Sequence, residues 1–200
     1  PQGIIRTHGL FIGRERRYFE EAVALAQQKN MILLDQPIDK AVVYLDEQEF
    51  KSTWLGNKAI YRTRMAMADG GELIVLAPGV DKFGEDLAVD GLIRKYGYKG
   101  RDYVLDTVKE APDLAANLSA AAHLIHGSSD GRFRITYCTR HLSRDEVEGV
   151  GYGYMPYAEA VAKYPIDTLQ PGPNRLQDGE EVYYIPNPAL GLWVEKSKLN

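Results

Sequence analysis

The sequence has little of what stabilises secreted proteins or anchors membrane proteins. Its single cysteine, Cys138, cannot form a disulfide within the chain. The longest apolar runs, such as residues 73–77, have the length of a strand and fall far short of the roughly 20 residues that a membrane helix needs. No signal peptide is recognisable at the start. We therefore expect a cytoplasmic protein with no membrane partner.

A stripe of positive charge is also missing. The 24 lysines and arginines are interspersed with 28 aspartates and glutamates, which gives a net charge of -4. Proteins that follow a phosphate backbone concentrate basic side chains on one face. The sequence therefore predicts no nucleic-acid partner.

What is present is the composition of an ordinary folded domain. Hydrophobic residues make up 44% and charged residues 26% of the 200 residues, close to the averages of globular proteins. No internal repeat is visible. The chain starts at Pro1 and runs at once into Ile4 and Ile5, which we interpret as entry into a piece of a longer protein.

Apolar periodicity predicts alternating strands and helices. We expect strands at 8–12, 31–34, 41–44, 72–77 and 133–137, and helices at 14–28, 58–68, 86–96, 101–111, 113–126, 143–148 and 157–164. Residues 166–180 are expected to form a surface loop, and residues 181–200 a terminal strand pair, at 181–185 and 191–195, of antiparallel hairpin type. The pattern predicts an α/β fold with a mixed, largely parallel sheet, helices on both faces and a single compact domain.

The junction near residue 70 is the best-defined local feature. We expect Asn57 to cap the helix over 58–68, Gly70 and Gly71 to end it, and a buried strand to follow at once.

Two histidines three residues apart, His123 and His126, form the first candidate site. On a helical projection neither belongs to the apolar stripe of Leu118, Ala121 and Ile125, and both lie in the last turn, where the helix dipole favours an imidazolium. The pair could receive an anion or pass a proton, or it could merely cap carbonyls or face solvent. A metalloprotein using both histidines stays open, although the helical zinc signature uses i, i+4 spacing.

A second candidate site is a helical run of basic and aromatic residues. Tyr61 and Arg64 are three residues apart and share a face, which offers a carboxylate a phenol and a guanidinium fork. Arg62 lies between them. A small hydroxy acid suits this pair, and the alternative is a helix whose arginines are solvated.

Other conspicuous residues are interpreted as structural. The glycine-rich run 149–153 lacks the context of a dinucleotide-binding loop. Cys138 is most simply a buried small residue, and Trp54 and Trp193 are expected in the core or in the wall of a pocket.

Several stretches resemble the C-terminal region of the lactate racemase family. They are residues 54–62 (Trp-Leu-Gly-Asn-Lys-Ala-Ile-Tyr-Arg), residues 68–78 (Ala-Asp-Gly-Gly-Glu-Leu-Ile-Val-Leu-Ala-Pro), residues 9–13 and residues 122–127. The similarity covers roughly residues 8–165. It identifies residues 1–200 as the C-terminal lobe of a two-lobed racemase-like protein.

The resemblance implies an activity for the whole protein. Enzymes of this family racemise or epimerise 2-hydroxy acids with a nickel pincer nucleotide, which the N-terminal lobe mainly holds. Hydride leaves the substrate's Cα for the cofactor and returns to the other face, while histidines of the N-terminal lobe handle the hydroxyl proton. None of those residues maps onto this chain, so the resemblance implies a fragment that is inactive alone and binds no cofactor. Its partners would be the N-terminal lobe and, in a homo-oligomer, further copies.

The resemblance also implies substrate contacts. The family pattern is a tyrosine followed by glutamine, with a lysine three residues after that glutamine. Tyr61 matches the tyrosine, Arg62 takes the glutamine position and Met65 the lysine position, while Arg64 offers a neighbouring cation. This departure favours a sugar acid at least as much as lactate. We expect the substrate contacts to be Tyr61, Arg62, Arg64, His123 and His126, and the alternative is a non-catalytic small-molecule binding or regulatory module.

Overall fold

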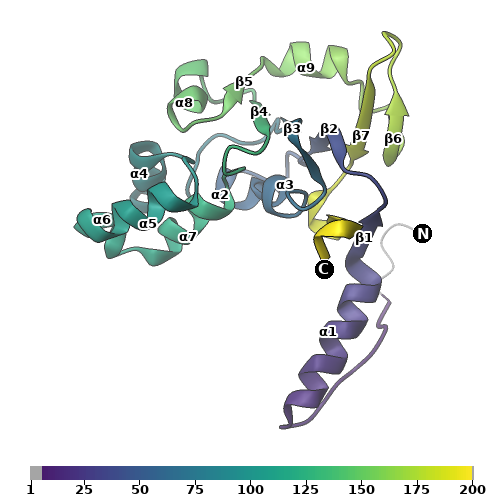
Figure 1. Cartoon of the computed structure of the whole chain (residues 1–200). Coiled ribbons are helices and arrows are strands. Elements are labelled where there is room, and N and C mark those ends of the chain that lie inside the picture. Colours follow the sequence, from purple (N-terminus) through teal and green to yellow (C-terminus); the bar gives the residue numbers. More distant parts are fainter. Residues whose placement is uncertain (1–5, 200) are drawn as a thin grey trace.

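A six-stranded sheet forms the centre of the computed structural model, which describes residues 6–199 (Figure 1). Its strands are β2 (Ile38–Tyr44), β3 (Met67–Leu76), β4 (Arg134–Cys138), β5 (Gly153–Tyr154), β6 (Gly172–Arg175) and β7 (Glu181–Ile185). Their order is β5-β4-β3-β2-β7-β6, and every neighbouring pair is parallel except β6 and β7.

The central strands are buried on both faces because apolar side chains point in both directions. Along β3, Leu73 and Val75 join one hydrophobic cluster, while Ile74 and Leu76 join the other. A strand with two covered faces needs a continuous apolar run, and residues 73–77 supply it. The sequence pattern therefore already requires a layer on each side of the sheet.

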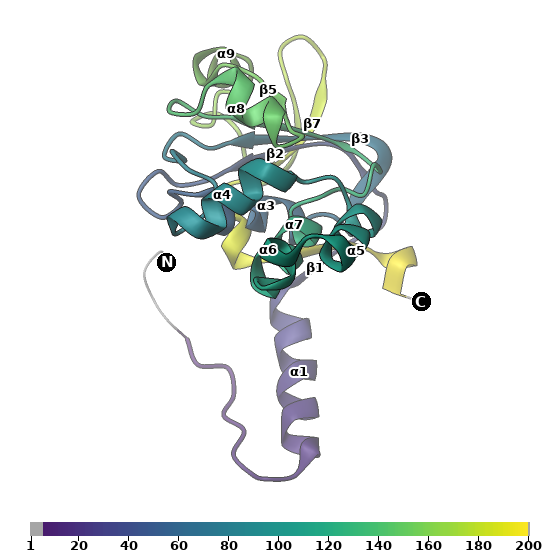
Figure 2. The ribbon, with the colours of Figure 1, turned by 90° about the vertical axis from the view of Figure 1, so that its left-hand side faces the viewer.

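Helices supply both layers (Figure 2). On the face that holds the candidate site lie α2 (Thr53–Gly56), α3 (Lys58–Tyr61), α4 (Leu87–Tyr96), α5 (Arg101–Glu110), α6 (Pro112–Ala115) and α7 (Leu118–His126). The opposite face carries α9 (Tyr157–Lys163), and α8 (Arg144–Gly149) lies beside the edge strand β5. This arrangement confirms the predicted α/β fold, with a mixed, largely parallel sheet in a single compact domain.

One helix stands away from that domain. Helix α1 (Arg16–Asn30) extends from the body and buries none of its residues (Figure 1). It leads into β1 (Met31–Leu34), which pairs in parallel with β8 (Leu192–Glu195) in a small second sheet. Two short 3-10 turns, η1 (Pro188–Leu190) and η2 (Lys196–Leu199), flank β8. Within residues 6–199, no helix combines the length and apolar character that crossing a membrane requires.

Several predicted elements are wrong where long-range pairing decides the outcome. Residues 8–12 form no strand, since they have no sheet partner. The predicted terminal pair does not form, because β7 pairs with β2 and β6 while β8 pairs with β1. Strand β6 falls inside the predicted surface loop 166–180. The helix predicted at 113–126 is two helices, and Asn117 caps the second by accepting from the Ala120 N–H.

The predicted helix over 58–68 is also wrong. Only Lys58–Tyr61 is helical, and a turn over residues 62–66 leads directly into β3. The Thr63 hydroxyl donates to the Ala59 carbonyl at 2.6 Å, so a side chain occupies this acceptor. Gly70, with φ of 80°, lies inside β3, where the pairing with β2 shifts register. The Asn57 side chain caps nothing.

Side-chain capping stabilises the start of α8. Ser143 and Glu146 form a capping box at the start of α8. Replacing Ser143 by alanine is expected to lower the free energy of unfolding by about 1 kcal/mol, because the Glu146 N–H loses the Ser143 hydroxyl oxygen as its acceptor. Urea denaturation measures the difference. Ser129→Ala is the control, since the Ser129 side chain makes no hydrogen bond within residues 6–199, and equal losses in both variants would contradict the prediction.

Candidate functional site

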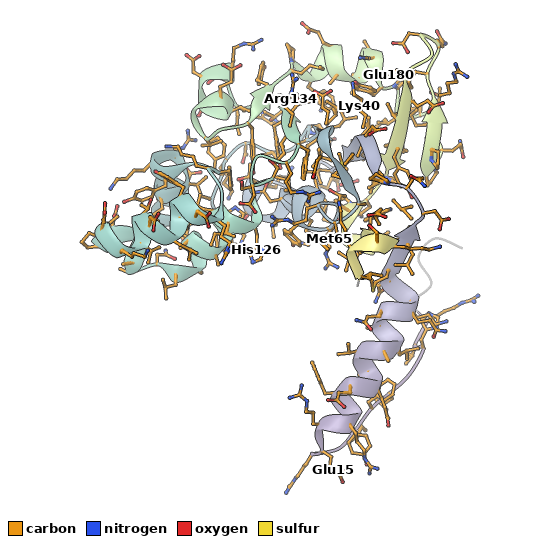
Figure 3. All side chains as sticks on the ribbon, viewed as in Figure 1. Glu15, Lys40, Met65, His126, Arg134 and Glu180 are labelled. Carbon is orange, nitrogen blue, oxygen red and sulfur yellow. The ribbon has the colours of Figure 1, made fainter. Side chains whose placement is uncertain are left out.

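A hollow of about 450 Å³ lies between α7 and the short helices α2 and α3. Trp54, Tyr61, Ser119, Ala122, His123 and His126 line it. The hollow thus brings together three of the five predicted substrate contacts, namely Tyr61, His123 and His126. Figure 3 shows His126 on the lower side of the body, the side from which α1 extends.

Helix α7 supplies one wall because four of its residues share a face. Ser119, Ala122, His123 and His126 have the spacing i, i+3, i+4 and i+7, which places them along one stripe. The helix ends at His126, as predicted. The two histidines therefore project on the same side into the hollow.

The facing wall comes from α2 and α3. Ser52 caps α2 by accepting from the Leu55 N–H at 3.3 Å, and Trp54 follows in the first turn. The Trp54 ring stacks on the His123 ring with centroids 4.4 Å apart. The Tyr61 ring meets the His126 ring edge-on, with centroids 6.3 Å apart. Each histidine thus has one aromatic partner from this wall.

His123 differs from the sequence-based expectation. Its side chain is buried, with 8% of the residue exposed, although the helical projection placed it outside the core. Burial, with a smaller effect from His126, lowers the pKa of His123 to about 4. The expected imidazolium is therefore wrong for this residue, because desolvation outweighs the helix dipole. His126 is exposed, as expected.

The predicted arginines do not line the hollow. The Arg64 guanidinium donates to the Asp130 carboxylate at 2.7 Å. Arg62 is half-buried, its Nε is without a hydrogen-bond partner among residues 6–199, and its Cζ lies 5.9 Å from the centre of the Tyr61 ring. Since the helix ends at Tyr61, the face that Tyr61 and Arg64 were expected to share does not exist. Met65, at the family's lysine position, is exposed on the same side of the body as His126 (Figure 3).

Residues that the sequence did not single out complete the site. Tyr98 contacts the buried nitrogen of His123, and Thr53 contacts Tyr98. Both are distant from His123 in the sequence and carry no motif, so nothing local pointed to them. Ser119 had a usable signal, since it lies on the helical stripe that the two histidines share.

A larger hollow of about 660 Å³ lies between the β1–β2 connection and strands β6 and β7. Its lysine, Lys40, already forms ion pairs with Glu72 at 3.0 Å and with Glu180. We place the candidate site in the smaller hollow because imidazole, phenol and indole side chains converge there.

Two further expectations concern metals and the cysteine. Within residues 6–199, no three His, Cys, Asp or Glu side chains gather as metal ligands, so the structure offers His123 and His126 no third ligand. Cys138 is fully buried, and burial raises its pKa to about 12. A thiol in that state is a poor nucleophile, which agrees with the structural interpretation.

Comparisons with known proteins bear on the fold. A scan of protein-family models and a search of curated proteins find no match. A solved structure of a Thermotoga maritima protein matches with a TM-score of 0.68 and 25% identity, covering 88% of this chain and 41% of that one. The lactate racemase apoprotein from Thermoanaerobacterium thermosaccharolyticum matches with a TM-score of 0.58 and 13% identity, covering 89% of this chain and 40% of that one.

The chain has a lactate-racemase-like fold. This agrees with the fold that the sequence resemblance implied. The chain spans about two fifths of the length of both solved structures, so the match is to a part of each.

Proposed function

We propose that this chain is the substrate-contacting lobe of a racemase or epimerase of 2-hydroxy acids. The observation that carries the proposal is the hollow in which Tyr61, His123 and His126 converge on a lactate-racemase-like fold. Ligands of such enzymes are small and polar, and about 450 Å³ accommodates a short hydroxy acid or a sugar acid.

The reaction would need a second lobe of the same protein. A nickel pincer nucleotide held there would supply the hydride acceptor. We assign none of residues 6–199 to nickel, because no ligand set gathers among them. The role proposed for this chain is to bind and orient the substrate: the Tyr61 phenol donates a hydrogen bond to the carboxylate, and the Trp54 ring excludes water from one side.

A chirality assay on the full-length protein, loaded with the nickel cofactor, tests the proposal. The panel pairs the two enantiomers of short 2-hydroxy acids with sugar acids such as gluconate. Cofactor-dependent racemisation or epimerisation of any member supports the proposal. If no member of the panel is racemised or epimerised while the cofactor is bound, the proposed activity is wrong and a non-catalytic binding module is favoured.

Tyr61→Phe is expected to lower kcat/KM about tenfold or more, because the substrate carboxylate loses a hydrogen bond. The matched control is Tyr103→Phe on α5, whose ring packs near Lys99 and does not line the hollow. Steady-state kinetics of both variants against the unmodified protein measure the effect. Equal activity of Tyr61→Phe and the control would exclude Tyr61 from substrate binding.

The arginines remain part of the proposal as substrate contacts made in the complete enzyme. For Arg64 such a contact would compete with its ion pair to Asp130. Arg62→Ala and Arg64→Ala are therefore measured in the same assay, where a raised KM supports each assignment. Unchanged turnover in both variants would exclude Arg62 and Arg64 as substrate contacts.

A further inference from the structure

The buried histidine of the hollow is oriented by a chain of hydrogen bonds. Trp54 covers one face of the His123 ring, and the Tyr98 ring meets it edge-on at 5.6 Å between centroids. Its Nε2 lies 2.9 Å from the Tyr98 phenol oxygen. That oxygen lies 2.8 Å from the Thr53 hydroxyl, which lies 2.9 Å from the Phe83 carbonyl oxygen.

The direction of this chain follows from counting protons. A carbonyl oxygen only accepts, so the one hydroxyl proton of Thr53 goes to Phe83. The Thr53 oxygen then accepts from Tyr98, whose one phenol proton is thereby used. The Tyr98 oxygen can only accept from His123, which places the ring proton on Nε2.

As placed, the Asn57 amide points a donor at this nitrogen, so the proposed direction requires the amide to be turned. Its Nδ2 lies 3.5 Å from His123 Nε2, and its buried Oδ1 is without a partner among residues 6–199. Turning the amide by a half-turn leaves its shape unchanged and brings the oxygen toward Nε2. A protonated His123 Nε2 then has two hydrogen-bond acceptors beside it, the Tyr98 oxygen and Asn57 Oδ1.

The other ring nitrogen is consequently a lone-pair acceptor. His123 Nδ1 makes no hydrogen bond within residues 6–199, and the ring borders the hollow. The low pKa of His123, about 4, keeps the ring neutral at pH 7, and a positive charge on His126 disfavours a second one here. Tyr98 and Tyr61 are the other titratable groups beside the ring. Burial raises the pKa of Tyr98, so that phenol stays neutral.

We propose that His123 presents an unprotonated Nδ1 to the hollow and accepts a hydrogen bond there from a ligand hydroxyl, with Thr53 and Tyr98 as positioning residues. The ligand half of this inference rests on the proposed function, whereas the tautomer does not. A lone pair repels a carboxylate oxygen and attracts a hydroxyl proton. The hydroxyl of a bound hydroxy acid thus faces His123, and its carboxylate faces Tyr61 and His126.

Specificity follows from this acceptor. A site that hydrogen-bonds a ligand hydroxyl discriminates strongly against the analogue that lacks it, because a buried polar group is then left unpaired. The hollow should therefore prefer lactate to propionate and gluconate to 2-deoxygluconate, by at least tenfold in each pair.

Nitrogen NMR of the chain with 15N-labelled histidine tests the tautomer. At pH 7 the His123 ring is expected with its proton on Nε2 and a free Nδ1. Tyr98→Phe removes the acceptor and is expected to introduce the other tautomer. Tyr96→Phe is the matched control, since the Tyr96 hydroxyl donates to Asp113 and does not contact His123. A His123 proton on Nδ1 in the unmodified chain would overturn the inference and leave the proposed function untouched.

Ligand titration of the full-length protein tests the second half. The expected result is a change in the 15N chemical shift of His123 Nδ1 when lactate or gluconate binds. Propionate and 2-deoxygluconate should bind at least tenfold more weakly than their hydroxylated partners. Tyr98→Phe should reduce the ratio of the two affinities within each pair. A variant that merely destabilises the fold would weaken both ligands equally and leave this ratio unchanged. Equal binding within each pair would overturn the hydroxyl assignment even if the racemase assay is positive, so the two failures are distinguishable.

Discussion

Gly127→Ala is expected to lower the free energy of unfolding by about 3 kcal/mol, the upper range for overpacking a core. A Cβ at this position would overlap Asn57 Nδ2 and the ring of Tyr98, whose Cδ1 would lie 2.5 Å away. That ring cannot retreat easily, because it stacks on the Tyr152 ring with centroids 4.5 Å apart. The Gly127 backbone itself, with φ of -80°, would tolerate alanine, so the effect is one of space alone.

Gly91→Ala is the matched control for this substitution. Gly91 lies inside α4, and a Cβ there meets nothing within 4 Å. Alanine is expected to stabilise the chain by up to about 1 kcal/mol through its helix propensity. Urea denaturation at pH 7 measures both variants. An unchanged midpoint for Gly127→Ala would show that the Tyr98 ring moves freely, and the rigid positioning of His123 would then be wrong.

Acidification from pH 7 to pH 4 is expected to cost about 3 kcal/mol of stability through His123 alone. Burial lowers the pKa of this residue from 6.5 to about 4 in the folded state. The unfolded chain therefore binds the proton more tightly, and protonation favours unfolding. The contribution is fully present above about pH 6.5 and is lost as the pH falls through about 4.

Urea denaturation of the unmodified chain and of His123→Gln at pH 7, 5.5 and 4 measures this effect. The carboxylates titrate in both proteins, so the difference between them isolates His123. That difference should shrink by about 3 kcal/mol over the range. His126→Gln, at an exposed position of the same helix, is the matched control. A constant difference for His123→Gln would mean that His123 titrates as in an unfolded chain.

Helices with strong local signals were predictable from the sequence. Asp86 caps α4 by accepting from the Val89 N–H at 2.8 Å, and Ser143 with Glu146 caps α8. Both caps act over three residues, so the sequence holds the whole signal. The helix over 58–68 failed because a glycine pair can end a helix or shape a strand. Pairing with β2 decided that Gly70 and Gly71 belong to β3.

Three of the five predicted substrate contacts lie in the candidate site, and the two that do not were misplaced by the same error in the helix over 58–68. His123, His126 and Tyr61 stood out because of helical spacing and the family resemblance, and the structure brings all three to one hollow. Arg62 and Arg64 were grouped with them on the assumption that one helix continues past Tyr61. The turn that replaces the helix sends Arg64 to Asp130.

The sequence by itself determined the α/β class, the apolar run of the central strand and the placing of His123 and His126 together near the end of one helix, because each depends on a pattern of a few residues. Only the tertiary structure decided the strand order, the pairing of β8 with β1 and the neutrality of His123. The charge of an imidazole depends on what surrounds it, and here Trp54 and Tyr98 lie 69 and 25 residues away along the chain. Desolvation acts through space, so no local pattern could have revealed it.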